Sequence, residues 1–101
     1  MKHLILLVEK WAEDRNLIKG ATTHAQMLKF VEEFGELAGA ITKDNRVVQI
    51  DSIGDILVVL IILSKQLDID IEDALRTAYD EIKDRKGKMI NCVFVKDSDL
   101  K

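Results

Sequence analysis

The chain has 101 residues, no proline, five aromatic residues in all and a formal net charge of −3 at pH 7. This length predicts one domain, residues 1–101, with a modest core. The predominance of Leu, Ile, Val, Ala, Glu and Lys indicates an all-α protein. The negative net charge argues against binding of nucleic-acid polymers through a broad basic surface.

The cysteine content and the apolar runs indicate the compartment. Cys92 is the single cysteine, so an internal disulfide is excluded and a reducing compartment is favoured. The apolar run at residues 4–8 is too short for a signal peptide. The longest run, residues 56–63, is far below the ~20 residues that span a bilayer. We therefore expect a soluble, cytoplasmic protein with no membrane partner.

The first two predicted helices are defined by apolar spacing. The first has apolar residues at helical intervals from Leu4 onward, until Gly20 breaks the pattern. The second opens with Thr23-His24-Ala25-Gln26, which fits a capping box. Its apolar stripe follows a 3.6-residue period through Met27, Phe30, Val31, Phe34, Leu37, Ala38 and Ile41.

The third helix is predicted from about Val47 to Leu67, after a turn at residues 42–46 in which Asp44 or Asn45 is the N-cap. Residues 56–63 leave this helix no polar face, and a helix that is apolar all round is buried on every side. One short chain can hardly surround it, so a second copy is expected to complete the core.

A fourth helix is predicted after Asp70, with Gly87 as its stop and an extended tail from about Met89. The predicted architecture is therefore a four-helix bundle completed by oligomerisation.

Acidic residues recur on two of these helices. In the second, Glu33 borders the apolar stripe, Glu36 lies beside it, and Glu32 lies further towards solvent. In the third, Asp51 and Asp55 are four residues apart and share a face. Val58 and Ile62 continue that face, so both aspartates are expected to face a buried region. A short turn makes the two helices antiparallel neighbours, which predicts that the acids converge.

The expected register sets Glu33 level with Asp55, and Glu36 level with Ser52 and next to Asp51. Partly desolvated carboxylates repel one another unless a cation lies among them. A hard divalent cation with oxygen ligands, Mg²⁺ above all, meets that need. The competing interpretation is plain surface charge, because E-x-x-E is common on exposed helices.

Three segments carry a family resemblance: LKFVEEFGELAGAI, DSIGDILVVLIIL and AYDEIKDRKGKM. They resemble the MazG-like branch of the all-α nucleoside triphosphate pyrophosphohydrolases over about residues 23–96. The likeness is greatest to the short single-domain type found in phages and Gram-positive bacteria. The resemblance implies a Mg²⁺-dependent enzyme that cleaves a (deoxy)nucleoside triphosphate to monophosphate and pyrophosphate. It also implies a homodimer or homotetramer.

The family pattern E-E-x-x-E followed by E-x-x-D implies the roles of the acids. Glu32, Glu33 and Glu36 match the first motif, and Asp55 matches the last Asp of the second. Ser52 stands where the pattern has Glu, and Asp51 is expected to supply that carboxylate. Glu32 or Glu36 would orient the attacking water. The predicted metal ligands are Glu33, Glu36, Asp51 and Asp55.

The resemblance also implies basic residues that hold phosphates. Lys83, Arg85 and Lys86 are the candidates on the last helix, and Lys29, one turn before Glu33, is a further one. An alternative for the first three is that they solvate a helix end and complement its dipole.

Two other functions compete with the enzyme. One is an oligomer that binds a nucleotide or a protein and has lost turnover through the change at Ser52. The other is a purely structural helical bundle.

Overall fold

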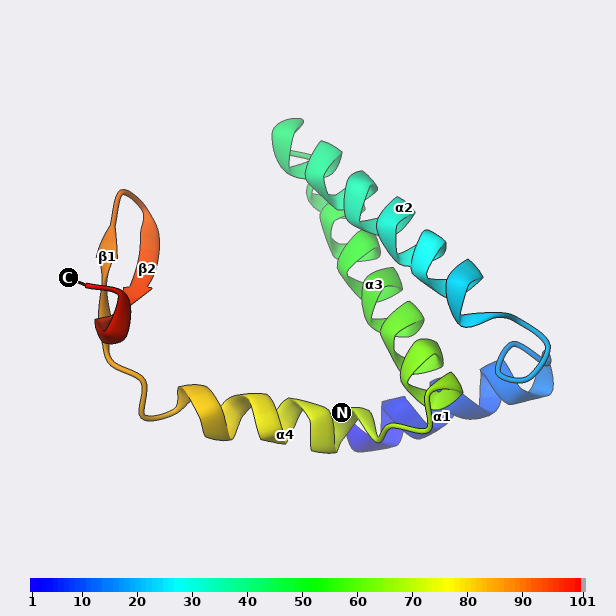
Figure 1. Ribbon diagram of the computed structural model, residues 1–101. Helices are drawn as coiled ribbons and strands as arrows, with labels where there is room; N and C mark the ends of the chain where they lie inside the picture. Colours follow the sequence, from blue (N-terminus) through cyan, green and yellow to red (C-terminus); the bar gives the residue numbers. More distant parts are fainter. Residues whose placement is uncertain (101) are drawn as a thin grey trace. The chain divides into compact units, whose positions relative to one another are not determined.

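The computed structural model describes residues 1–100, which form two compact units, Met1–Ile71 and a second unit that begins at Glu72. The first contains α1 (Lys2–Asp14), α2 (Thr23–Thr42) and α3 (Arg46–Gln66). The second carries α4 (Ile71–Ile82), the strands β1 (Gly87–Ile90) and β2 (Val93–Lys96), and the 3-10 helix η1 (Asp97–Asp99) (Figure 1). The predicted all-α class is confirmed, with four helices and one small hairpin.

The start of α2 lies one residue away from the predicted cap. The N-cap is Thr22, whose backbone is extended and whose hydroxyl accepts a hydrogen bond from the Ala25 backbone N–H at 3.0 Å. Thr23 is already the first helical residue, so the predicted capping box beginning at Thr23 is wrong. Two successive threonines carry the same capping signal, and only the backbone distinguishes them.

The turn between α2 and α3 makes these helices antiparallel neighbours. Asp44 has a positive φ of 53°, and the N–H groups of Asp44 and Asn45 donate to the carbonyls of Ile41 and Ala40, which is a Schellman motif. The Asn45 side chain then accepts from the Val48 N–H at 3.2 Å and caps α3. Of the two predicted N-caps, Asn45 is the one the structure uses.

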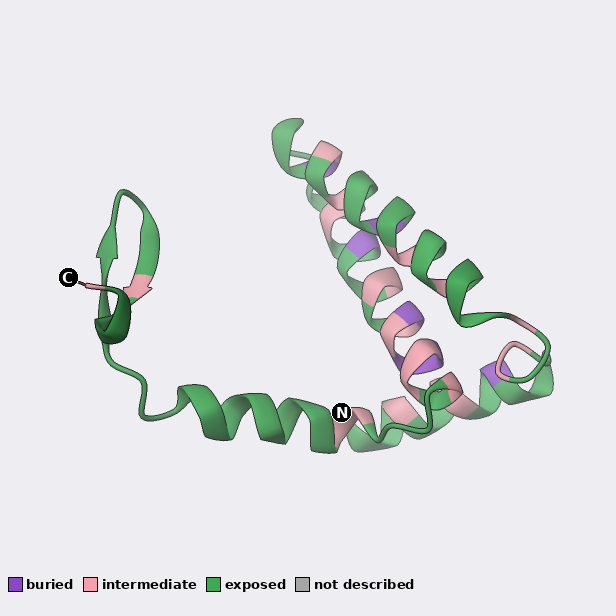
Figure 2. Ribbon diagram, in the orientation of Figure 1, coloured by how far each residue is buried: buried purple, intermediate pink, exposed green. Residues whose placement is uncertain are grey.

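The first unit has a small core in which α3 contacts both α1 and α2. Its buried apolar residues are on all three helices (Figure 2): Ala12, Ala40, Val59, Ile61 and Ile62. The polar side chains buried with them are Glu33 and Ser52. Beyond α1, Gln66 ties the connecting loop to α3 by donating to the carbonyls of Leu17 and Ala21.

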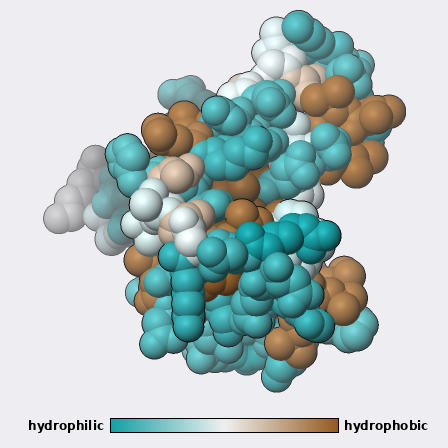
Figure 3. All heavy atoms as spheres, turned by 90° about the vertical axis from the view of Figure 1, so that its right-hand side faces the viewer, coloured by the Kyte–Doolittle hydropathy of each residue, from teal (hydrophilic) through white to brown (hydrophobic). Residues whose placement is uncertain are grey.

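Large apolar side chains remain on the surface of the isolated chain. In α2 they include Val31 and Phe34, which are 61% and 58% exposed, and in α3 they include Ile53 and Leu57. Apolar groups are visible among the polar ones on the face in Figure 3. The apolar run of α3 is therefore not buried on every side within one chain. Its burial by a second copy remains a prediction.

The composition of α3 also allows another environment. By length and hydropathy alone, this helix is able to cross a membrane. A core helix of a soluble protein meets the same criterion, so the evidence for a membrane span is weak. Asp51 and Asp55 interrupt the apolar sequence near its middle, where a charge in hydrocarbon is costly.

The second unit differs from the sequence prediction at Gly87. Helix α4 ends at Ile82, and the Lys83 and Arg85 N–H groups bond to the carbonyls of Tyr79 and Ile82. Gly87 begins β1 instead of ending the helix, so the predicted helix stop is wrong. A side chain at Gly87 would collide with the Val95 carbonyl and the Phe94 ring, which explains glycine at this strand position.

The expected extended tail is an antiparallel hairpin. Met89 pairs with Phe94, and Ile90 pairs with Val93. The two connecting residues, Asn91 and Cys92, both have positive φ, 51° and 67°, as a type I′ turn requires. Asn is a favoured residue at the first position of such a turn, so Asn91 is the signal for a hairpin that sequence reasoning missed.

Candidate metal and nucleotide site

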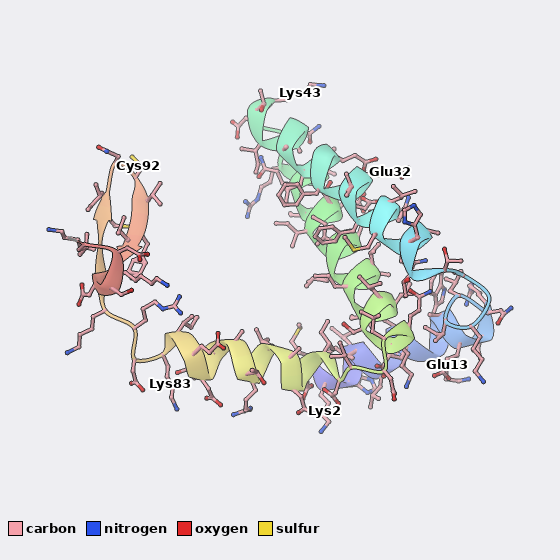
Figure 4. The ribbon with its side chains drawn as sticks, in the orientation of Figure 1. Lys2, Glu13, Glu32, Lys43, Lys83 and Cys92 are labelled. Atoms are coloured by element: carbon pink, nitrogen blue, oxygen red, sulfur yellow. The ribbon has the colours of Figure 1, made fainter. Side chains whose placement is uncertain are left out.

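The centre of the candidate site is a buried carboxylate on α2. Glu33 is only 5% exposed, although an ionised carboxylate is among the costliest groups to bury. Ala40, seven residues further along α2, is also buried, so both lie on the helix face that packs on α3. Glu32 lies about 100° round the helix from Glu33, with a side chain that is 67% exposed, and points away from α3 in Figure 4.

Two further carboxyl groups surround Glu33. Those of Glu36 and Asp55 both lie near enough to Glu33 for its charge to act on them. The negative charge of Glu33, followed by desolvation, raises the pKa of Glu36 above its ordinary value. Burial, followed by the charges of Asp51 and Glu33, raises the pKa of Asp55. The predicted register of Glu33 with Asp55 is therefore present.

Lys29 supplies the positive charge in this cluster. Its Nζ lies 3.3 Å from Glu33 Oε1 and 3.7 Å from Glu32 Oε2. The hydrogen bond and charge of Glu33 raise the pKa of Lys29. The i,i+4 spacing of Lys29 and Glu33 is a sequence signal for such a pair. Sequence reasoning considered only a phosphate-binding role for this lysine.

One oxygen of Glu33 remains without a donor. Its Oε2 is buried and has no hydrogen-bond partner among residues 1–100. The neighbouring Glu36 and Asp55 offer only acceptors when they are ionised. No three His, Cys, Asp or Glu side chains in the described part of the chain are grouped tightly enough to hold a metal ion. The donor chemistry nevertheless suits a hard cation, because Glu33, Glu36 and Asp55 offer carboxylate oxygens.

The second predicted motif, on α3, differs from the expectation in which of its side chains is buried. Ser52 is 1% exposed, and its hydroxyl has no hydrogen-bond partner among the described residues. The inward face of α3 continues from Ser52 through Val59 and Ile62. Asp51, one residue and 100° away, is exposed, so the expectation that it faces a buried region is wrong. Its effect on the pKa of Asp55 still places its charge near the site.

This arrangement gives a prediction for the second motif. Asp51→Asn is expected to lower Mg²⁺-dependent pyrophosphate release about tenfold, because it removes a carboxylate beside Asp55 while preserving shape. Ser52→Ala is expected to change pyrophosphate release less than twofold. Ser52→Glu restores the family pattern and is expected to retain or raise activity. The three variants are compared by their pyrophosphate release at saturating and at limiting Mg²⁺. Normal turnover in Asp51→Asn together with failure of Ser52→Ala would refute the contribution of Asp51 to the site.

The remaining predicted phosphate-binding residues belong to the second unit. Lys83 Nζ lies 3.5 Å from Asp80 Oδ1. Arg85 and Lys86 line a hollow of about 400 Å³ within that unit. Lys96 and three acids, Glu81, Asp84 and Asp97, line it as well. The contribution of these cations to a nucleotide site remains a prediction.

The fold and site define an all-α protein with an acid-rich site on two antiparallel helices. Residues 21–90 match the family model of the MazG nucleotide pyrophosphohydrolase domain, and the chain belongs to this family. The predicted family resemblance is confirmed, as is the similarity to phage proteins.

A curated relative from Haemophilus phage HP1 (strain HP1c1), described as an uncharacterized 18.2 kDa protein in the rep-hol intergenic region, is similar to this chain. The two are 49% identical over 70 residues, which cover 69% of this chain and 43% of the relative. The matched part thus spans less than half of the relative's length. No solved structure matches the chain.

Proposed function

We propose that this protein is a Mg²⁺-dependent pyrophosphohydrolase that cleaves a (deoxy)nucleoside triphosphate to the monophosphate and pyrophosphate. Family membership supports nucleotide pyrophosphohydrolase activity. The observation that carries the metal dependence is the buried Glu33 Oε2, which lacks a donor while Glu36 and Asp55 approach the same carboxyl group. A divalent cation would supply the positive partner that this carboxyl group lacks.

The acids have distinct roles in this proposal. Glu33, Glu36 and Asp55 would hold the cation, and Asp51 would add negative charge from the exposed side. The bound cation supplies positive charge that counters the charge of the triphosphate and of the transition state. Glu32 or Glu36 orients the attacking water and accepts its proton. The oxygen of this water would bond to the α-phosphorus as the bond from the α-phosphorus to the bridging oxygen breaks, and pyrophosphate would leave.

The charge of Glu33 raises the pKa of Glu36 in the metal-free chain. A cation bound among these acids would lower that pKa, so it does not choose between Glu36 and Glu32 as the base. Glu32 has the advantage of exposure to solvent, from which the water comes. Glu32→Gln and Glu36→Gln, compared at saturating Mg²⁺, identify the base. Loss of the base lowers kcat even at saturating Mg²⁺, whereas the loss of a metal ligand that is not the base is compensated by added Mg²⁺.

A screen of the common ribo- and deoxyribonucleoside triphosphates for pyrophosphate release tests the proposal. We expect release with at least one triphosphate in the presence of Mg²⁺ and none after chelation. Asp55→Asn is the matched inactive variant, because it keeps the side-chain shape and removes one ligand charge. Release that persists in Asp55→Asn or without a divalent cation would contradict the metal site.

A binding module without turnover is the second candidate. The neutral, buried Ser52 at the position of a family Glu favours it. Binding of Mg²⁺ and a nucleotide with no monophosphate produced from any triphosphate would support this function over the enzyme.

A further inference from the structure

Lys29 occupies an unusual position for a surface lysine. Its side chain is 53% exposed, yet its ammonium contacts Glu33, whose side chain is only 6% exposed. The same ammonium lies 3.7 Å from Glu32. Lys29 therefore stands at the edge of the acid cluster, with its charge directed inward and its stem in solvent.

The acid cluster requires positive charge even before it binds a ligand. Three carboxyl groups, those of Glu33, Glu36 and Asp55, lie within interaction range of one another. The only oxygen of Glu33 with a cationic neighbour among residues 1–100 is Oε1, which contacts Lys29, while Oε2 is buried without a partner. Lys29 thus neutralises part of a cluster that has further capacity for a cation.

We propose that Lys29 is a tethered counter-cation that competes with the divalent metal for Glu33, so that metal binding displaces its ammonium from the site. This inference rests on the proposed function and adds a regulatory element to it. A metal ion held by Glu33 would take up lone pairs to which Lys29 bonds, and its positive charge would repel the ammonium. Lys29 moves easily, because its side chain is half exposed and solvation replaces the lost contact.

The exchange has a consequence for metal affinity. A metal ion has to break the Lys29–Glu33 contact in order to bind. The lysine therefore lowers the affinity of the site for the metal and its occupancy at low metal concentration. Removing the ammonium is expected to increase affinity for a divalent cation about five- to tenfold, the effect of one solvent-screened charge at contact distance.

The test is binding of Mn²⁺ alone, followed by electron paramagnetic resonance in the absence of nucleotide, because Mn²⁺ takes the same oxygen ligands as Mg²⁺. Lys29→Met keeps the apolar stem and removes the charge. Lys29→Arg keeps the charge and is expected to bind Mn²⁺ within about twofold of wild type. Lys10→Met is the matched control, because Lys10 forms an i,i+4 pair with Asp14 at 3.2 Å away from the acids.

The outcomes separate this inference from the proposed function. Tighter Mn²⁺ binding in Lys29→Met, with no change in Lys10→Met, supports competition. Equal tightening in both variants is a general effect of net charge and overturns it. Unchanged or weaker binding in Lys29→Met, while wild type binds Mn²⁺, also overturns it and leaves the metal site intact. Absence of Mn²⁺ binding in wild type overturns the metal site and the competition together.

Discussion

Replacing Glu33 by Gln is expected to lower activity strongly and to stabilise the metal-free protein. Activity falls on the order of 100-fold, because one ligand charge of the cation is lost and such charge stabilisation is worth several kcal/mol. Stability rises because the substitution removes a buried negative charge close to Glu36 and Asp55. The new amide can also donate a hydrogen bond to either acid, which the carboxylate at this position cannot.

Urea unfolding without metal, together with Mg²⁺-dependent pyrophosphate release, measures the two effects. Wild type should gain stability from Mg²⁺, since a ligand bound only by the folded state stabilises it, whereas Glu33→Gln should gain little. Glu32→Gln is the control for stability, because Glu32 is exposed and its loss is expected to leave unfolding unchanged. A metal-free Glu33→Gln protein that is clearly less stable than wild type would show that the Lys29 pair outweighs the repulsion.

The same acids set the sign of the pH dependence. Glu36 and Asp55 have pKa values above their ordinary ones in the folded chain. A carboxyl group whose pKa is higher in the folded chain than in the unfolded chain stabilises the fold at pH values below its unfolded pKa. This stability is lost as the pH rises through the folded pKa. The metal-free protein should therefore lose stability from these two groups as pH increases above the ordinary carboxyl range. In Glu33→Gln this loss should be smaller.

The second large effect is expected in assembly. At micromolar concentration we expect a homodimer or homotetramer, with two or four times the 11.5 kDa mass of the chain. Val31, Phe34 and Leu57 are 41% to 61% exposed in the isolated chain. Burying such a side chain contributes about 1.5–3 kcal/mol, so several together offset the cost of association.

Light scattering of wild type and Leu57→Lys tests this prediction. The lysine places a charge on the apolar surface of α3 and should shift the population strongly towards monomer, with a lower Tm. Thr77→Lys adds the same charge to an exposed position of α4 and should leave the mass unchanged. A stable wild-type monomer at micromolar concentration would contradict the assembly.

Local features of the sequence predicted most of the helices. Apolar periodicity indicated all four, and Asn45 was recognised as a cap because its side chain bonds to a backbone N–H only three residues away. The prediction that Glu33 and Asp55 lie level with each other followed from the short turn, since two helices joined by few residues have to be antiparallel. These features depend on neighbours along the chain, which the sequence displays directly.

Tertiary structure decided which side chain of each adjacent pair points inward. Asp51 and Ser52 differ by one residue, and the packing of α3 on α2 buries the serine and leaves the aspartate exposed. Gly87 marks a strand that approaches Val95, a contact with a residue eight positions away. The sequence by itself thus determined the class, the helices and the acids of the site. Their burial and the free oxygen of Glu33 depend on contacts between elements, because periodicity gives a face only to within about one residue.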